Sequence, residues 1–319
     1  MGLLTNLFGK QDMADAPHLE TAVAHAVSAV EPLLMQTGGY PDRYRQPVSA
    51  ALAYARQLAD SLPGPVLIDR EAYARDAFVH ALFPDANAIS DAIASSLSMQ
   101  EYLRRPISGN GFYALMGMRR VDKKFLGMEM AGATLQRDVV QQATYFINHT
   151  LENPSPDEAL AREMIATSFF HSLVDKVKAR IELRRQSKET LTAETNALMP
   201  RLRHINDIER AATEERMDKM ADELQSTIES LEPEHFLADF EAVLLHPEEH
   251  LRLNRTSITL DSMGIRHTAD DPGQGKEFML CELIGYDRRD WNVMIVRCTD
   301  LQYETFAEKL DKAYRYLSL

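Results

Sequence analysis

The chain has 319 residues, of which 45% are hydrophobic and 26% are charged, and its formal net charge is −13. These fractions are typical of soluble globular proteins and exclude collagen-like and low-complexity classes. The acidic balance argues against a general nucleic-acid coat, because phosphate binding requires a basic surface. A chain of this length is expected to form two or three folding units.

The sequence shows no membrane or secretion signal. Near the N-terminus, the apolar stretch Leu3–Phe8 is shorter than the apolar core of a secretory signal and lacks its charged start. Cys281 and Cys298 are too few for a disulfide scaffold, and we expect two buried thiols. We therefore expect a cytoplasmic protein without a membrane partner.

Apolar residues recur every three or four positions from residue 17 to residue 105, the period of amphipathic helices. Glycine and proline clusters interrupt this pattern. Because no single segment has enough apolar surface to be stable alone, the pattern predicts a helical bundle over 17–105, after a flexible N-terminus at 1–16. The four candidate helices are His18–Met35, Pro47–Leu62, Asp69–Leu82 and Ala86–Arg104.

Short apolar runs replace the helical period over residues 106–154. Phe112–Met118 and Phe125–Met130 flank the polar segment Arg119–Lys124, which predicts a β-hairpin with its turn in that segment. Residues 139–150 alternate loosely and are a candidate third strand. We therefore expect a β-hairpin region here.

A helix start signal follows at Ser155–Glu158, where a capping serine precedes a proline and two acidic residues. It predicts a long helix over Pro156–Met199, and a second helix is predicted over Asn206–Leu231. Residues 155–232 therefore form either a long antiparallel helical hairpin, which projects as an arm, or a dimerising coiled coil.

The period changes to two after the short predicted helix Glu234–Leu245. Phe278–Ile284 and Trp291–Cys298 flank a polar turn and predict a second hairpin, and Leu301–Leu317 predicts a terminal helix. Residues 233–319 are thus expected to form a C-terminal α+β domain, a small antiparallel sheet with a covering helix. The predicted fold class of the whole chain is α+β, mainly α.

One motif indicates a metal site. His246, Glu249 and His250 match the H-x-x-E-H spacing of one class of zinc peptidases. Two imidazoles on one ion would require a helix through the whole motif, whereas Pro247 is tolerated only at a helix start and a strand-like pattern follows His250. The alternatives are a zinc-dependent hydrolase and a surface loop that contains His and Glu.

Another pattern indicates an interaction face. Lys176, Arg180 and Arg184 are spaced four residues apart and form one basic row on the long helix. Such a row could meet phosphate or an acidic partner, but interspersed acidic residues are typical of a solvated face. A nucleic-acid-associated regulatory factor acting through Lys176–Arg185 is therefore a second alternative, and nucleic acid is not the expected partner. The apolar stripe of the second helix adds four candidate interaction residues, Met217, Met220, Leu224 and Ile228.

No nucleophile elbow or phosphate-binding loop accompanies these patterns. The sequence does not decide whether the chain is an enzyme, but it favours a non-enzymatic protein, and we assign no catalytic residue and no cofactor. We expect a protein–protein interaction, scaffold or assembly function that uses the helical arm and the C-terminal α+β unit. The partner is expected to be a protein, including a second copy of the chain in a homodimer.

Overall fold

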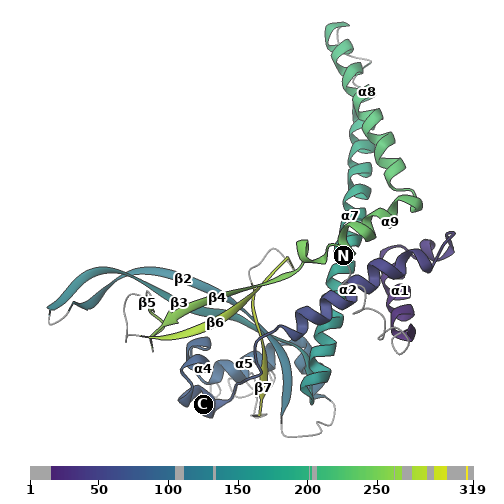
Figure 1. Ribbon diagram of the computed structural model, residues 1–319. Coiled ribbons are helices and arrows are strands. Elements are labelled where there is room, and N and C mark those ends of the chain that lie inside the picture. The colour runs from purple at the N-terminus through teal and green to yellow at the C-terminus, as the bar shows by residue number, and fades with distance from the viewer. Residues whose placement is uncertain are drawn as a thin grey trace, which may run out of the picture. The chain divides into compact units, whose positions relative to one another are not determined.

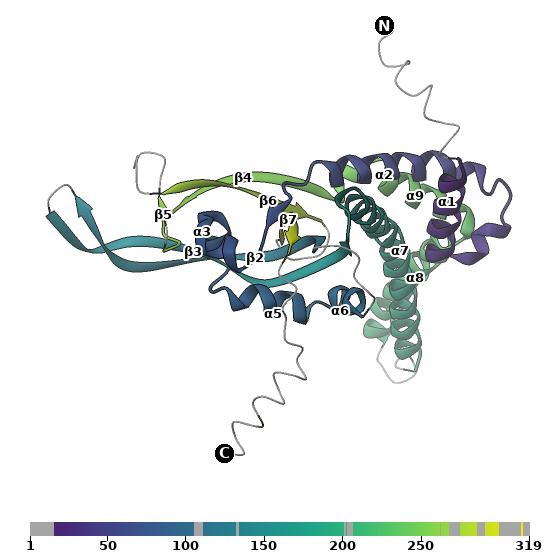
Figure 2. The same ribbon diagram turned by 90° about the horizontal axis from the view of Figure 1, so that it is seen from below.

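The computed structural model shows an α+β protein (Figures 1 and 2). The chain folds into two compact units, Met1–Ala55 with Phe169–His250 and Arg56–Ser168 with Leu251–Leu319. Within the described ranges, no helix combines the length and the apolar character that a membrane crossing requires. The structure describes residues 16–104, 111–131, 134–200, 202, 207–261, 263–267, 275–285, 291–299 and 314.

The first unit is helical in its described part. α1 (Ala16–Val30) and the short η1 (Pro32–Gln36) precede α2 (Asp42–Asp60), which begins in this unit and ends in the other. Val27 of α1 and Val48 of α2 are fully buried. The helix period of the sequence therefore identifies the buried faces of both elements correctly.

Two long helices form most of the rest of this unit. α7 (Glu158–Leu198) and α8 (Asp207–Ser230) run side by side in opposite directions (Figures 1 and 2). A carboxylate oxygen of Glu194 on α7 lies 3.7 Å from a guanidinium nitrogen of Arg216 on α8. We call the part of α7 beyond residue 169 together with α8 the helix pair, and its two helices match the two that the apolar spacing predicts.

Three short elements follow α8 in the described part of this unit: η3 (Pro233–His235), α9 (Phe236–Leu244) and η4 (Pro247–Glu249). α9 confirms the short helix predicted before the C-terminal strands. The ring of Phe240 on α9 meets the ring of Tyr44 on α2 edge-on, with centroids 5.0 Å apart. This contact fixes α9 against the start of α2.

The second unit contains one seven-stranded sheet with the order β3–β2–β7–β6–β4–β5, and β1 pairs with β7. The N–H of Thr144 on β3 donates to the carbonyl of Gly264 before β5 at 2.8 Å, so the two edges of the sheet approach each other. A single sheet thus contains both the central hairpin and the C-terminal strands, which lie in separate segments of the predicted organisation. The strands are β1 (Val66–Leu67), β2 (Phe112–Ala131), β3 (Thr134–Ser155), β4 (Arg252–Leu260), β5 (Arg266–His267), β6 (Lys276–Ile284) and β7 (Trp291–Cys298).

Four short helices pack on this sheet. Ile89 and Met99 are buried in one core cluster with Phe112 and other strand residues. The predicted helical bundle over 17–105 is therefore wrong in its packing, because the helices between residues 70 and 103 bury their apolar faces on strands. A helical period identifies the buried face but not the element that covers it. These helices are α3 (Arg70–Arg75), α4 (Ala77–Leu82), α5 (Asn87–Ser95) and α6 (Leu97–Leu103).

A hairpin is present in this region, but the predicted one is wrong, because Phe112–Met118 and Phe125–Met130 both belong to β2 and the pairing partner is β3. Arg119–Lys124 lies inside β2 and pairs with residues 142–147 of β3. The candidate third strand at 139–150 is thus the second strand of the same hairpin. A strand accepts charged side chains where water or an opposite charge reaches them, and Lys123 and Lys124 are exposed while Arg120 pairs with Asp122, so a charged run does not mark a turn there. We call residues 119–131 and 134–147 the ribbon.

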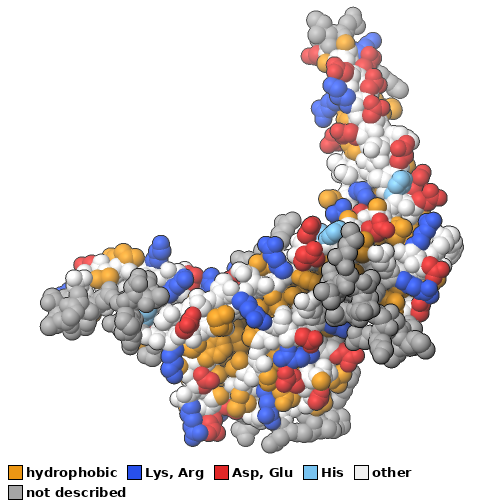
Figure 3. Space-filling model, in the orientation of Figure 1, with side chains coloured by type: hydrophobic (Ala, Val, Ile, Leu, Met, Phe, Trp, Pro, Cys, Tyr) orange, Lys and Arg blue, Asp and Glu red, His pale blue; other side chains and the backbone are white. Residues whose placement is uncertain are grey.

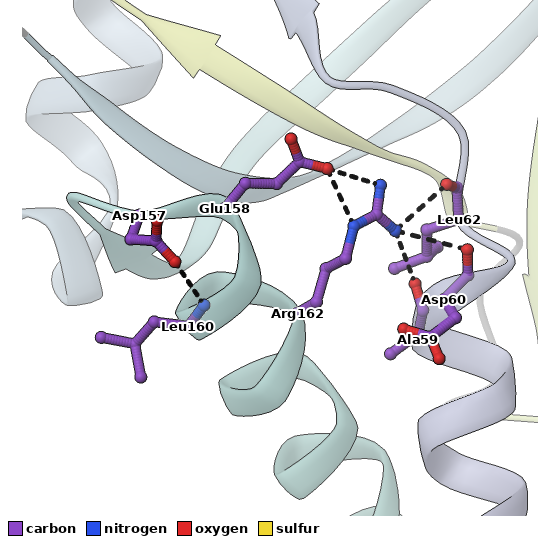
Figure 4. Close-up of polar contacts among 7 residues, drawn as sticks. All are labelled: Ala59, Asp60, Leu62, Asp157, Glu158, Leu160 and Arg162. Atoms are coloured by element: carbon purple, nitrogen blue, oxygen red, sulfur yellow. Dashed lines mark hydrogen bonds and ion pairs between the residues drawn. The ribbon is translucent and has the colours of Figure 1, made fainter.

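Two polar side chains, Asp157 and Arg162, stabilise the start of α7 (Figure 4). The carboxylate of Asp157 accepts a hydrogen bond from the N–H of Leu160 at 3.0 Å, so Asp157 is the capping residue. The predicted cap, Ser155, instead ends β3 and accepts from the N–H of Asp157 at 3.3 Å. One turn into α7, Arg162 pairs with Glu158 and donates to carbonyl groups at the end of α2.

The C-terminal hairpin predicted from period-two runs is confirmed by β6 and β7, which pair at Leu283–Trp291. Three other expectations lie outside the described residues. They are the flexible N-terminus over residues 1–15, the polar turn at 286–290 and the covering helix, of which only Tyr314 is described.

Candidate functional site

The apolar stripe of α8 is largely covered within the first unit. Met220 is 7% exposed, and Met217 and Leu224 are half-buried. Only Ile228 of the four predicted interaction residues is exposed, at 38%. The antiparallel hairpin alternative accounts for this burial, because a coiled coil between copies would require the same stripe to be free.

A groove lies between the two helices of the pair, with a volume of about 590 Å³. α7 contributes Leu191, which is half-buried, and α8 contributes the carboxylates of Asp222 and Glu223, which are exposed. The groove therefore combines an apolar contact with two negative charges. Its other lining residues are Ser187, Thr190, Ser226 and Thr227.

The predicted basic row is engaged by a buried carboxylate on α9. Asp239 is 3% exposed, and its two oxygens pair with Arg180, at 3.3 Å, and with Arg184. The Nε of Arg184 is buried and has no hydrogen-bond partner among the described residues. These two arginines thus hold α9 against α7. Of the three residues in the predicted basic row, only Lys176 does not pair with Asp239, and its side chain is half-buried.

A second cavity, of about 430 Å³, adjoins this ion pair. Its lining includes Arg180, Arg184 and Asp239, so two positive charges already face a buried negative one. Glu229 adds another carboxylate. The cavity therefore has no excess of positive charge for a phosphate. Ser226 lines both this cavity and the groove, so the two adjoin each other.

The H-x-x-E-H motif lies in a single 3-10 turn. η4 covers Pro247–Glu249, and the Nε2 of His250 lies 3.3 Å from the carbonyl oxygen of Ala242. The α-helix that would align His246 and His250 is not formed. In the parts of the chain that the structure describes, no group of three or more His, Cys, Asp or Glu side chains could hold a metal ion.

Cys281 and Cys298 are both buried thiols, as expected. Burial raises the pKa of the Cys281 thiol, although nearby Arg255 lowers it to a lesser extent. A buried thiol with a raised pKa is a poor nucleophile at neutral pH. The cysteines therefore contribute to the sheet interior rather than to a reactive site.

Sequence reasoning missed a polar cluster that the sheet assembles. Arg120 lies 3.4 Å from Asp122 and 3.6 Å from Glu282, and the hydroxyl of Thr144 donates to Asp122 at 2.6 Å. The amide of Asn292, 1% exposed, has no hydrogen-bond partner among the described residues. These residues come from four strands, so no local spacing in the sequence could have grouped them.

Comparisons with protein-family models, with curated proteins and with solved structures found no match to this chain. No relative therefore indicates which residues are functional, and the candidate site is defined by its geometry alone.

Proposed function

We propose that the protein is a non-enzymatic interaction protein, acting as a scaffold, adaptor or assembly subunit in the cytoplasm. Its docking surface is the groove of the helix pair, and its first candidate partner is a second copy of the same chain, as in a homodimer. We expect the C-terminal strands, which belong to the sheet of the second unit, to support the same function. The groove between α7 and α8 is the single observation that carries this proposal.

The chemistry of the groove defines the partner. Asp222 and Glu223 border it, while Leu191 offers apolar area beside them. A partner segment that presents basic side chains next to one or two small apolar side chains would satisfy both features. Acidic and basic side chains both lie along the visible face of the helix pair (Figure 3). Such a charged surface is typical of the rim of a protein interface, which keeps water away from the smaller contact at its centre.

Light scattering on the untagged full chain tests the proposal. We expect a dimer or larger species at micromolar concentration, and we expect Asp222→Lys with Glu223→Lys to weaken association at least tenfold, because like charges across an interface cost affinity. The matched control is Glu214→Lys with Asp218→Lys, which makes the same charge change on α8 outside the groove lining. A compact monomer that retains no protein partner in a pull-down would contradict the proposal.

The two other candidate functions have weaker support. The hydrolase alternative requires a helix through the H-x-x-E-H motif, and this segment is a 3-10 turn. The nucleic-acid alternative requires a free basic row, and Arg180 and Arg184 pair with Asp239. Neither alternative is favoured by a specific observation.

A further inference from the structure

The ribbon exposes large apolar side chains on both of its faces. Side chains alternate between faces along a strand, so Leu126 and its cross-strand partner Val140 lie on one face, while Phe125 lies on the other. Leu126 is 66% exposed and Val140 is 68% exposed. The other exposed apolar side chains of the ribbon are Met128, Tyr145 and Ile147. Exposure of this extent in one segment marks an interaction surface rather than an ordinary protein exterior.

The same segment is positively charged although the whole chain is acidic. Its sequence has five basic residues and three acidic ones, Asp122, Glu129 and Asp138. Arg120 pairs with Asp122 and Glu282. Within the described part of the chain, no ion pair engages the other four basic residues, Arg119, Lys123, Lys124 and Arg137. The net charge of −13 therefore hides a local cationic surface.

Charge and apolar surface are combined on both faces. Lys124 and Leu126 lie two positions apart on one face, and Lys123 and Phe125 have the same spacing on the other. In Figure 3, hydrophobic and basic side chains lie close together on the visible part of the ribbon, at the left. A partner must therefore accept apolar side chains from two opposite faces and carry negative charge next to them.

We propose that the ribbon docks peripherally on an anionic lipid surface, with its apolar side chains among the lipid headgroups and upper acyl chains and its lysines beside lipid phosphates. A lipid surface surrounds an inserted segment, whereas a folded protein partner covers one face of it. Four cations without an ion pair among the described residues are few for a nucleic-acid duplex, and phosphate contacts would leave the apolar side chains uncovered. This inference is independent of the groove on the helix pair.

The depth of insertion follows from the backbone. β7 pairs with β2 only over Phe112–Met118, so no described strand pairs with the outer edge of β2 beyond Met118. Unpaired N–H and C=O groups are costly in the hydrocarbon core but are satisfied by water and headgroups at the interface. The ribbon therefore lies at the interface and does not cross the bilayer.

Co-sedimentation of the full chain with vesicles tests the proposal. We expect binding to phosphatidylcholine vesicles that contain 30% phosphatidylglycerol, weaker binding to pure phosphatidylcholine, and a decrease with salt. Lys123→Gln with Lys124→Gln should weaken binding roughly 25-fold, at about a fivefold loss per lysine near an anionic surface. Leu126→Glu with Val140→Glu should abolish it.

Controls make the same kinds of change on the exposed surface of α7. Leu183→Glu, at a leucine that is 67% exposed, and Lys178→Gln with Lys188→Gln should leave vesicle binding unchanged. Leu126→Trp gives a second readout and adds no charge that could prevent folding. Its tryptophan fluorescence should shift to shorter wavelength when anionic vesicles are added. The single natural tryptophan, Trp291, provides the baseline in the unsubstituted chain.

Three results would overturn the inference. They are equal binding to neutral and anionic vesicles, retention of binding by Leu126→Glu with Val140→Glu, and no fluorescence shift for Leu126→Trp. Duplex DNA binding that the lysine variant abolishes, without vesicle binding, would assign the ribbon to nucleic acid instead. A change of oligomeric state in the Leu126→Glu, Val140→Glu variant without vesicles would assign it to a protein interface.

Discussion

The guanidinium of Arg162, in the second turn of α7, donates to the carbonyl oxygen of Ala59 near the end of α2 at 3.0 Å (Figure 4). The same nitrogen lies 3.4 Å from the carbonyl oxygen of Asp60 and 3.5 Å from that of Leu62. Glu158 holds the guanidinium from its other side at 2.9 Å. One side chain thus satisfies the last carbonyl groups of a helix that is distant in sequence.

Arg162→Met should lower the free energy of unfolding by roughly 2 kcal/mol. The substitution keeps much of the apolar stem but removes charge-assisted hydrogen bonds, leaving half-buried carbonyl groups unpaired. Urea denaturation measures the effect. Arg137→Met, at an exposed arginine outside the ion pairs of the described residues, is the control and should change stability by less than about 0.5 kcal/mol. Equal effects of the two substitutions would show that the contact does not stabilise the fold.

Asp239→Asn should destabilise the first unit by roughly 2–3 kcal/mol. The amide has the size of the carboxylate but not its charge, so Arg180 and Arg184 would lose their counter-ion at a nearly buried position. Glu241→Gln, at an exposed site on the same helix, is the matched control. Thermal denaturation followed by circular dichroism distinguishes them, and an unchanged melting temperature for Asp239→Asn would exclude a stabilising role for the ion pair.

Gly64→Ala should cost about 2 kcal/mol or more. Gly64 has a φ of +112°, and a Cβ there would lie 2.2 Å from the backbone oxygen of Ile295 on β7. Both the conformation and the approach to β7 exclude a side chain unless the backbone moves. Gly38→Ala meets nothing within 4 Å and should be tolerated. If chemical denaturation gave the same stability for both variants, the close approach of this segment to β7 would be wrong.

Acid should destabilise the second unit through His149. Burial lowers the pKa of His149 below its ordinary value of 6.5, although a contact of its Nε2 with the carbonyl oxygen of Leu82, at 2.9 Å, raises it to a lesser extent. The unfolded chain then binds more protons, so stability is unaffected well above pH 6.5 and falls as the pH decreases from 6.5 toward the lowered pKa.

The slope of this loss is at most about 1.4 kcal/mol per pH unit for one histidine. Denaturant titrations at several pH values should show a flatter profile for His149→Gln than for the unsubstituted chain between pH 7 and pH 5. His18→Gln, at an exposed histidine, is the matched control. A profile for His149→Gln that matches the unsubstituted chain would mean that His149 is protonated equally in both states.

Local patterns predicted the elements better than their packing. The period of three and four residues identified both helices of the helix pair, and the period of two identified β6 and β7. The same signal could not distinguish a helix that packs on helices from one that packs on a sheet, and α5 and α6 belong to the second kind. A periodic pattern reports which face is buried but not the element that covers it.

The candidate site was harder to predict for a related reason. The spacing of Arg180 and Arg184 was visible in the sequence, but their partner, Asp239, is 55 residues or more away from both. The ribbon was missed because Arg119–Lys124 resembled a turn, which hid the exposed apolar residues beyond it. Contacts between segments that are distant in the sequence leave no local spacing from which a single chain reveals them.

We propose that the groove between α7 and α8 docks a second copy of the chain. Light scattering at increasing protein concentration compares the unsubstituted chain with the Asp222→Lys, Glu223→Lys variant. The claim predicts a dimer or larger species that the variant shifts toward monomer, while Glu214→Lys with Asp218→Lys does not. A monomer at every concentration, or an oligomer that the groove variant leaves intact, would contradict it.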